Sequence, residues 1–455
     1  MAERIPGIIV RVVNSTGTVA PPAFQRYPCI VGLGDPYRLV ENTAIVRSVG
    51  SVDDIPSIST VNEIVSVGAL PGSASYTEGT DYYLIGDSSN RISWSPAGSQ
   101  PTEGNQYYIT YTETRAASAY QATLYFNENL VYTDHGNKTR TDGSLNDISV
   151  GANLAFQNGA NGVYVVQLDD REFSDPDNPS NSELETAFEN AVDVLEEIFD
   201  SKLWLVPMSS GTLNTTTAAN ILFNHAVLAS QPEQKQERSV LHPMPKNTAY
   251  TAYATRAQAY ANERMIVPAI PSTLQVTGFT GTKDSRYYCA GLAGKLCAGP
   301  IGATIYDEII AGLTFTDNFS RSQQNYMVQN GVSPAKSASG IVRNIMAIST
   351  DTTSALTEDL GVQDVKDYVK KYWREKLWQV YRNKPITNTL PNAVKQSSEG
   401  ILAYLQQEET IADYRNVTVL QDGTEPRQLN VAGEVQPAFG LAYMDVTFTF
   451  VLTFG

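Results

Sequence analysis

The sequence has few of the residues that build disulfides or metal centres. Of its 455 residues, three are cysteines and three are histidines. The cysteines show no CxxC spacing, which argues against a disulfide framework or a structural zinc site and predicts buried or unreactive thiols. The histidines form no HxH or HxxxH pair, so we expect no metal site built on them. These six residues are Cys29, Cys289, Cys297, His135, His225 and His242.

Positive charge is also scarce. Lys and Arg number 32 against 48 Asp and Glu, which gives a formal net charge of -16. This balance argues against nucleic acid or an anionic membrane as the main partner, because both require clustered cations. No apolar run reaches the roughly 18 residues of a membrane span. The start, MAERIPGIIVRVV, has no long apolar core of a signal peptide. We therefore expect a soluble protein made in a cytoplasm, without direct membrane insertion.

Motifs for nucleotide, calcium or acyl-transfer chemistry are incomplete or missing. In GLAGKLCAGPIG, Gly294-Lys295 is followed by Leu296 and not by the Ser or Thr of a phosphate-binding loop, so these small residues predict a closely packed helix. VGLGDP at 31–36 lacks the third glycine of a dinucleotide site. The acidic stretch 169–181 lacks the Gly and Glu of an EF-hand, and no GxSxG elbow occurs. We predict no enzyme activity, no catalytic residue, no metal and no cofactor.

What the sequence does contain is a globular composition, with 42% hydrophobic and 18% charged residues, arranged in four regions. Residues 1–45 predict an N-terminal strand and arm that join the core. Residues 46–115 read as a Tyr-rich antiparallel β insert. Residues 116–330 alternate strands with helices, which is typical of a parallel sheet flanked by helices. Residues 331–455 predict a C-terminal α+β domain completed by extended terminal strands. The predicted fold class is mixed α/β.

Three helices carry further signals. Ser182 and Glu185 fit a capping box at the start of a helix. Its apolar positions follow a helical period, and acidic residues occupy most of the others. Long helices are predicted at 360–383 and 393–414, and a strand at 415–421.

Both ends of the chain read as strands. The last eleven residues, DVTFTFVLTFG, alternate apolar and polar positions to the final residue. An apolar strand left free would promote aggregation, so it requires a sheet with an open edge. That sheet belongs either to the same domain or to a neighbouring copy. The residues predicted to cross between subunits are Ile8, Val10, Val12, Val446, Phe448, Phe450, Leu452 and Phe454.

The helix at 361–384 is basic in an otherwise acidic protein. Its cations form either a solvated face or a surface that docks on an acidic partner, including another copy of the chain. The residues predicted to contact a partner are Lys366, Lys370, Lys371, Arg374 and Lys376.

Several stretches, taken in order from residue 4 to residue 452, carry a family resemblance. They are RIPGIIVRVV, GTDYYLIGDSSNRISW, PTEGNQYYITYT, NGVYVVQLD, NGVSPAKSASGIVRNIMAIST, DVKDYVKKYWREKLW and AYMDVTFTFVL. Together they resemble the tail sheath proteins of contractile-tailed bacteriophages and related injection machines. One stretch departs from the family pattern: MIVPAIPSTLQVTG stands where PW and PPSG signatures are common.

The resemblance implies a structural subunit that forms hexameric rings stacked helically around a tail tube. Neighbours would be linked through shared β-sheets made by their N- and C-terminal extensions, with the β insert on the outside. Partners would be other copies, the tube protein, and baseplate and tail terminator proteins. The sheath would assemble in an extended metastable state in the host cytoplasm, become part of the virion, and contract to drive the tube through the host envelope.

Two other classes of function remain to be compared with this one. An enzyme could be built on the central α/β region, although it would need a convergent acid, base or cofactor loop. A surface-layer or adhesin protein would suit the Tyr-rich insert, although it would need an export signal. Electron microscopy of the purified protein separates the three, because a sheath gives striated tubes, an enzyme compact oligomers and a surface layer flat sheets.

Overall fold

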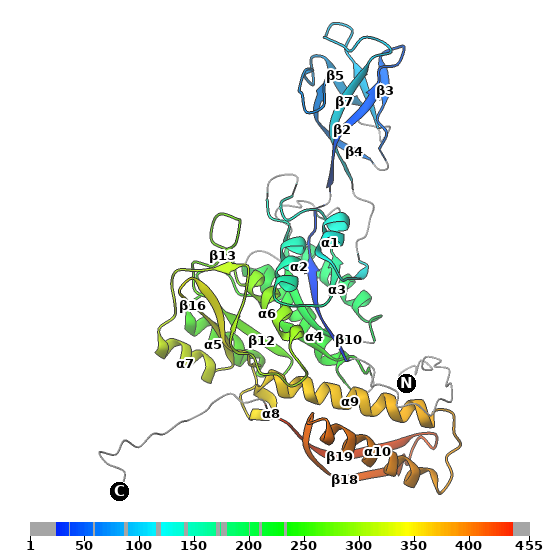
Figure 1. The fold of residues 1–455 in the computed structure, drawn as a ribbon, viewed down its shortest axis with the longest axis vertical. Coiled ribbons are helices and arrows are strands. Elements are labelled where there is room, and N and C mark those ends of the chain that lie inside the picture. Colours follow the sequence, from blue (N-terminus) through cyan, green and yellow to red (C-terminus); the bar gives the residue numbers. More distant parts are fainter. Residues whose placement is uncertain are drawn as a thin grey trace, which may run out of the picture.

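The computed structural model describes residues 24–35, 37–57, 60–85, 90–114, 120–140, 144–169, 173, 180–199, 201–208, 212–231 and 234–439. The chain is arranged as a central body, a β-rich unit at one end and a helical unit with a hairpin at the other (Figure 1). This is the mixed α/β fold predicted from the sequence. The predicted terminal strands, with Ile8 to Val12 and Val446 to Phe454, lie outside the described residues.

The central body is built on a nine-stranded sheet. In spatial order its strands are β14 (Tyr306–Ile309), β17 (Ile341–Met346), β16 (Val332–Ala338), β12 (Met265–Ala269), β11 (Arg238–Leu241), β10 (Ser201–Met208), β1 (Gln25–Gly32), β9 (Val163–Gln167) and β8 (Ala122–Tyr125). The six strands from β16 to β9 are parallel, and β8, β14 and β17 run antiparallel to their neighbours. Every residue of β10 is buried, as expected for a parallel strand covered on both faces.

Helices cover both faces of this sheet. One hydrophobic core joins it to α2 (Asp147–Gln157) and α6 (Arg286–Ala298), beside α1 (Glu128–His135). A second core lies on the opposite face. Its helices are α3 (Asn181–Leu195), α4 (Thr212–Ala229), α5 (Tyr250–Tyr260) and α7 (Arg321–Gln329). A short pair, β13 (Gln275–Val276) and β15 (Leu313–Thr314), borders the body.

Two predictions for helices of the body can be compared with the structure. The small residues of α6 do allow close packing, because a side chain at Gly294 would collide with the backbone of Ala155 on α2. The capping box of α3 is made by Ser180 and Glu183, so its prediction at Ser182 was wrong by two residues. The sequence offers the S-x-x-E pattern twice in succession, and only the packed helix start selects one of them.

The β-rich unit consists of two three-stranded antiparallel sheets. One is β2 (Tyr37–Val46), β7 (Gln106–Thr114) and β4 (Val61–Gly68), and the other is β3 (Val52–Asp54), β6 (Arg91–Trp94) and β5 (Tyr82–Ile85). Tyr107, Ile109 and Tyr111, at alternate positions of β7, fill the core of the unit together with Trp94 of β6. The buried Asp53 accepts hydrogen bonds from Trp94 Nε1 at 2.8 Å and from Tyr107 Oη at 3.1 Å. Tyr37 pairs with Thr114, so the unit begins and ends on adjacent strands.

The helical unit follows the central body. Its elements are α8 (Ala355–Glu358), α9 (Leu360–Tyr381), α10 (Leu390–Gln407), β18 (Ile411–Gln421) and β19 (Leu429–Pro437). The helix predicted to reach residue 414 ends at Gln407, because Glu409 adopts a left-handed backbone conformation (φ 57°) and Ile411 begins a strand. Within the described ranges, no helix combines the length and apolar character needed to cross a bilayer.

Candidate assembly interface

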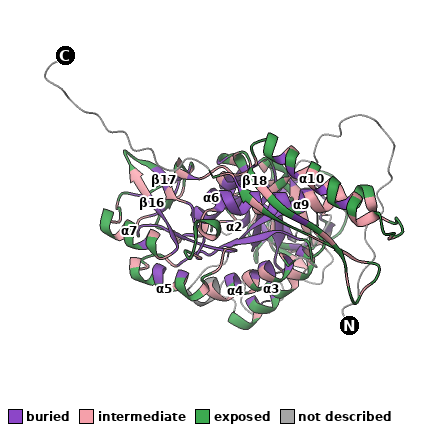
Figure 2. Cartoon of the chain, turned by 90° about the horizontal axis from the view of Figure 1, so that it is seen from below, coloured by how far each residue is buried: buried purple, intermediate pink, exposed green. Residues whose placement is uncertain are grey.

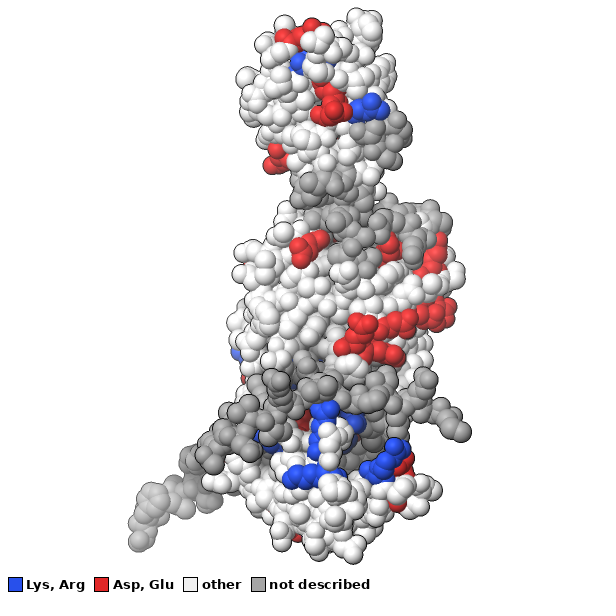
Figure 3. All heavy atoms as spheres, turned by 90° about the vertical axis from the view of Figure 1, so that its right-hand side faces the viewer, with Lys and Arg blue, Asp and Glu red and all other residues white. Residues whose placement is uncertain are grey.

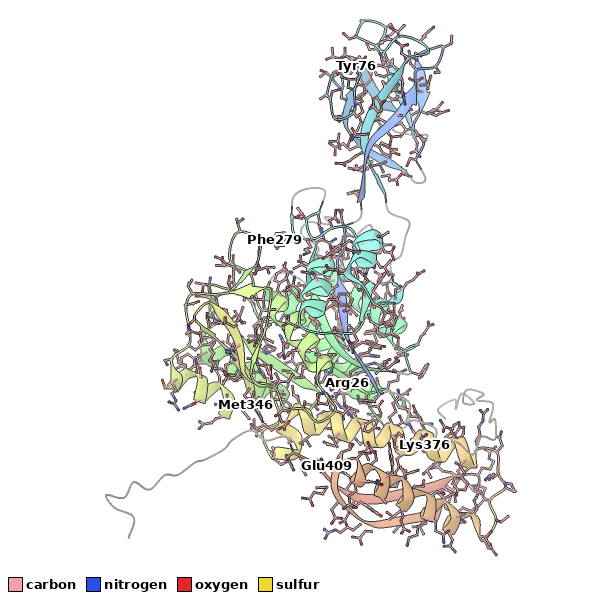
Figure 4. The ribbon with its side chains drawn as sticks, viewed as in Figure 1. Arg26, Tyr76, Phe279, Met346, Lys376 and Glu409 are labelled. Atoms are coloured by element: carbon pink, nitrogen blue, oxygen red, sulfur yellow. The ribbon has the colours of Figure 1, made fainter. Side chains whose placement is uncertain are left out.

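Helix α9 is attached to the central sheet by a buried network of charges. Asp364 and Asp367 lie one turn apart on the face of α9 that meets the sheet. Three cations face them from the entry ends of parallel strands: Arg26 on β1, Lys202 on β10, and Arg264, the residue before β12. Figure 4 shows Arg26 at the lower end of the body, where α9 passes beneath it.

The distances in this network are those of direct ion pairs. Lys202 Nζ lies 2.6 Å from Asp364 Oδ1 and 2.8 Å from Asp367 Oδ2. Arg264 donates to both oxygens of Asp367, at 2.6 Å and 2.7 Å. Arg26 Nη1 donates to Asp364 Oδ2 at 2.5 Å. Each carboxylate therefore bridges two cations, and the fork of Arg264 fixes the rotation of α9 about its own axis.

Asp367 stays ionised in spite of its burial. Burial alone raises the pKa of Asp367, but the charges of Arg264 and Lys202, both hydrogen-bonded to it, hold that pKa well below its usual range. A buried ion pair adds little net stability compared with apolar packing, yet removing one partner is costly. We therefore interpret the network as a device that determines where α9 sits on the sheet.

The structure separates the five basic residues predicted to contact a partner. Lys366 pairs with Glu263, and Arg374 Nη2 lies 3.3 Å from Glu237 Oε1. Lys371 is buried and donates to the Phe199 carbonyl at 3.4 Å. These three side chains thus bind α9 to its own body. Lys370 is exposed. Lys376, which Figure 4 labels on α9, has its Nζ 5.4 Å from the centre of the Tyr372 ring. Whether the helix also contacts a partner stays a prediction.

The other side of α9 carries α10 and the β18–β19 hairpin. Their core contains Tyr368 and Tyr372 of α9 and Leu402 and Leu405 of α10, packed against Ile411 and Val417 of β18. Tyr368 also contacts Phe24, just before β1, with ring centres 5.4 Å apart. The start of the described chain, α9 and the hairpin therefore meet at one place.

The hairpin has two open edges. β18 and β19 pair with each other, and within the described ranges no third strand joins either of them. One face is partly buried on the helices through Val417, Val431 and Val435, and the other is exposed (Figure 2). A two-stranded sheet with unpaired backbone groups on both sides is a template for further strands. The sequence had suggested part of β18 but not β19, whose apolar residues are interrupted by Gly433 and Glu434.

The central body contains buried cysteine and histidine side chains whose pKa values are shifted by burial. The three cysteines are free and buried, as predicted, and burial raises the pKa of Cys29 to about 12. Burial lowers the pKa of His225 and of His242 to about 4. In the part of the chain that the structure describes, no three His, Cys, Asp or Glu side chains are grouped to hold a metal ion.

Comparisons with known proteins agree with the fold. A family model described as a domain of unknown function (DUF4815) matches residues 37–128, which contain the β-rich unit and β8. No curated protein matches the sequence. Among solved structures, a chain of the anti-feeding prophage (AFP) baseplate, 6-fold symmetrised, aligns with a TM-score of 0.56 and 16% identity, over 73% of this chain and 89% of that one.

Two further structures give similar alignments. A chain of the PVC sheath complex of an extracellular contractile injection system, in the contracted state, has a TM-score of 0.52 and 13% identity over 74% of this chain and 88% of that one. A chain of the AFP baseplate in the contracted state has a TM-score of 0.51 and 14% identity, with coverage of 73% and 90%. At these identities the similarity is one of fold.

Proposed function

We propose that the chain is the structural subunit of a contractile tail sheath. It polymerises as hexameric rings stacked helically around a tail tube, in an extended metastable state, and contracts to drive the tube through the host envelope for genome delivery. Its partners are other copies, the tube protein, and baseplate and tail terminator proteins. The observation that carries the proposal is the open β18–β19 hairpin, on a chain that shares its fold with a component of a contractile sheath complex.

The hairpin is suited to receive the terminal strands of other copies. It offers two edges, and the sequence offers two candidate strands per chain, around Ile8 to Val12 and Val446 to Phe454. Each backbone hydrogen bond formed on strand addition contributes roughly 1 kcal/mol. Each apolar side chain buried adds about 1.5–3 kcal/mol. Because the hairpin edge is already formed, only the incoming strand loses conformational entropy when it binds.

The charge network would transmit force between the hairpin and the body. A neighbour's strand bound to the hairpin pulls on α9 through the shared core, and α9 is held to β1, β10 and β12 by Asp364 and Asp367. The energy for contraction would then reside in two packings of the polymer. In this proposal the protein is not an enzyme and works without a cofactor, as part of a virion tail assembled in the host cytoplasm.

The proposal is tested by removing the C-terminal strand. Deleting Asp445–Gly455 should leave a soluble monomer that forms no tubes, as seen by sedimentation and negative-stain microscopy. The same loss is expected for Phe448→Asp combined with Phe450→Asp. The matched control, Thr447→Ser with Thr449→Ser, changes the alternate positions of the strand that the sequence predicts and should polymerise. Normal tubes from the truncated chain would refute strand exchange, and flat sheets from the full chain would favour a surface layer.

A further inference from the structure

The two edges of the β18–β19 hairpin differ in regularity. β18 contains two bulges, one between Ile411 and Asp413 and one between Arg415 and Thr418, and at each of them β18 has one residue more than β19. Asn416, inside the second bulge, has a left-handed backbone conformation (φ 55°). A bulge interrupts the row of backbone groups with which a further strand would pair, and native sheets use bulges to block their edges. The edge of β18 is therefore a poor template.

β19 is regular along its whole length. Its nine residues pair with β18 without an extra residue of their own. Their side chains alternate: Leu429, Val431 and Val435 are partly buried, and the residues between them are exposed. The exposed row on the outer face is Asn430, Ala432, Glu434 and Gln436. A strand that pairs with the edge of β19 would therefore need apolar residues on one face and polar residues on the other.

An aromatic ring of α9 lies beneath the middle of β19. A Cβ atom at Gly433 would lie 3.0 Å from Cη2 of Trp373, so the ring packs directly against the backbone of the strand. Trp373 is still partly exposed, and no strand in the described ranges pairs with the outer edge of β19. A further strand on that edge would extend the apolar face of the hairpin over the ring.

The predicted C-terminal strand fits this edge. Val446–Phe454 is as long as β19, and its alternation places an apolar row on one face and three threonines with Val451 on the other. The predicted N-terminal strand fits less well, because its second face carries Ile9 and Val13, which would be exposed to solvent on β19. Length and pattern together thus favour the C-terminal strand as the occupant.

We propose that the C-terminal strand of one copy adds to the edge of β19, and not to that of β18, in another copy. Its phenylalanines then cover Trp373 of α9, and its threonines continue the exposed row of β19. This inference rests on the proposed polymer, in which either edge could receive either terminal strand, and it assigns one strand to one edge. Each copy receives one such strand and donates one, so the contact is head-to-tail and can propagate.

The test is a disulfide between chains. Ala432 of β19 and Thr418 of β18 are both exposed and lie directly opposite each other in the hairpin. A strand beside β19 lies about 4.8 Å from Ala432 and about twice as far from Thr418. A disulfide requires Cα atoms about 4.4–6.8 Å apart, so only the nearer position can be bridged. The three native cysteines are buried and should not interfere.

Chains that carry Ala432→Cys are mixed with size-tagged chains that carry one cysteine on the threonine face of the C-terminal strand. Four positions sample the register: Thr447→Cys, Thr449→Cys, Val451→Cys and Thr453→Cys. After assembly and mild oxidation, at least one mixture should give disulfide-linked dimers of the two chains on a non-reducing gel. The matched mixtures with Thr418→Cys should give at least about tenfold less of this product. Because the two cysteines are on different chains, a strand folded back on its own hairpin gives none.

The outcomes separate this inference from the function on which it rests. If the unmodified chain forms no tubes, the proposed function fails. If tubes form and the product appears with Thr418→Cys instead, or equally with both positions, the inference is wrong. It is also wrong if tubes form and neither position gives the product. A cysteine variant of the hairpin that forms no tubes is replaced by one at the next exposed pair, Asn430→Cys on β19 and Leu420→Cys on β18, with the same expectation.

Discussion

The side chains of Lys202 and Asp367 have no exposed surface, and they form an ion pair at 2.8 Å. Such a pair is tolerated only because each partner has a second one, Asp364 for the lysine and Arg264 for the aspartate. Lys202 Nζ also lies 4.5 Å from the centre of the Trp204 ring, which adds a cation–π contact. The intact network adds little to the free energy of unfolding, but removing one of its charged side chains is strongly destabilising.

Replacing Asp367 by asparagine should destabilise the chain by about 3–5 kcal/mol, because Arg264 then loses the carboxylate with which it pairs and Lys202 keeps only Asp364. The measurement is the midpoint of urea unfolding, monitored by tryptophan fluorescence. As a control, Glu399→Gln removes the partner of Lys395 in an exposed pair on α10, at 3.9 Å, and should cost less than about 0.5 kcal/mol. Equal midpoints for the two variants would show that the network does not hold α9.

At the scale of elements, the chain combines a self-contained insert with a helix that depends on its surroundings. The β-rich unit has its own core, and its first and last strands pair at Tyr37 and Thr114. Helix α9, in contrast, buries two aspartates that only the central sheet can neutralise. The insert is therefore expected to fold alone, and α9 with its hairpin is not.

A fragment of residues 37–114 should fold on its own. Its NMR spectrum should show dispersed amide resonances, and the indole of Trp94 should be protected from solvent. The rest of the chain, closed by a short Gly-Ser linker, should keep its fold as well. In the fragment, Asp53→Ala should abolish the fold, because it leaves the buried donors of Trp94 and Tyr107 unpaired at about 1–3 kcal/mol each. A disordered unmodified fragment would contradict this expectation.

For the molecule as a whole, charge is distributed unevenly. The formal net charge is -16, yet on the face that Figure 3 shows, basic atoms gather below an acidic band. The interior holds ionised carboxylates together with neutral histidines, and these two kinds of group respond to acid over different pH ranges.

Stability should fall as the pH drops from about 6.5 towards 4. Burial lowers the pKa of His225 and His242 from 6.5 to about 4, so the unfolded chain binds protons in this range and the folded chain does not. The loss of folding stability begins below about pH 6.5 and reaches roughly 3 kcal/mol for each histidine near pH 4. Asp367, whose pKa is lowered, adds a further loss only below its unfolded pKa of 3.8.

The measurement is the free energy of unfolding of the monomer against pH. The double variant His225→Gln with His242→Gln should show a smaller change in the free energy of unfolding between pH 6.5 and 4. An unchanged slope in this double variant would assign the acid sensitivity to other groups.

The sequence by itself determined the patterns that local periodicity encodes. These are the mixed α/β class, the Tyr-rich β unit, the alternation of strands and helices, the buried cysteines and the basic character of α9. The strands of the sheet could be recognised because burial on both faces requires continuous apolar runs, as in β10.

Only the tertiary structure decided which charges are bound internally and which remain on the surface. Lys371 and Lys370 are adjacent in sequence, yet the first is buried against Phe199 and the second is exposed. The partners in the α9 network are separated by as many as 338 residues, so no local pattern could have revealed them. The open hairpin could not be predicted in full for a related reason. β18 and β19 are strands because they pair with each other and pack on α9 and α10. Contacts of this kind are not encoded in a local sequence pattern.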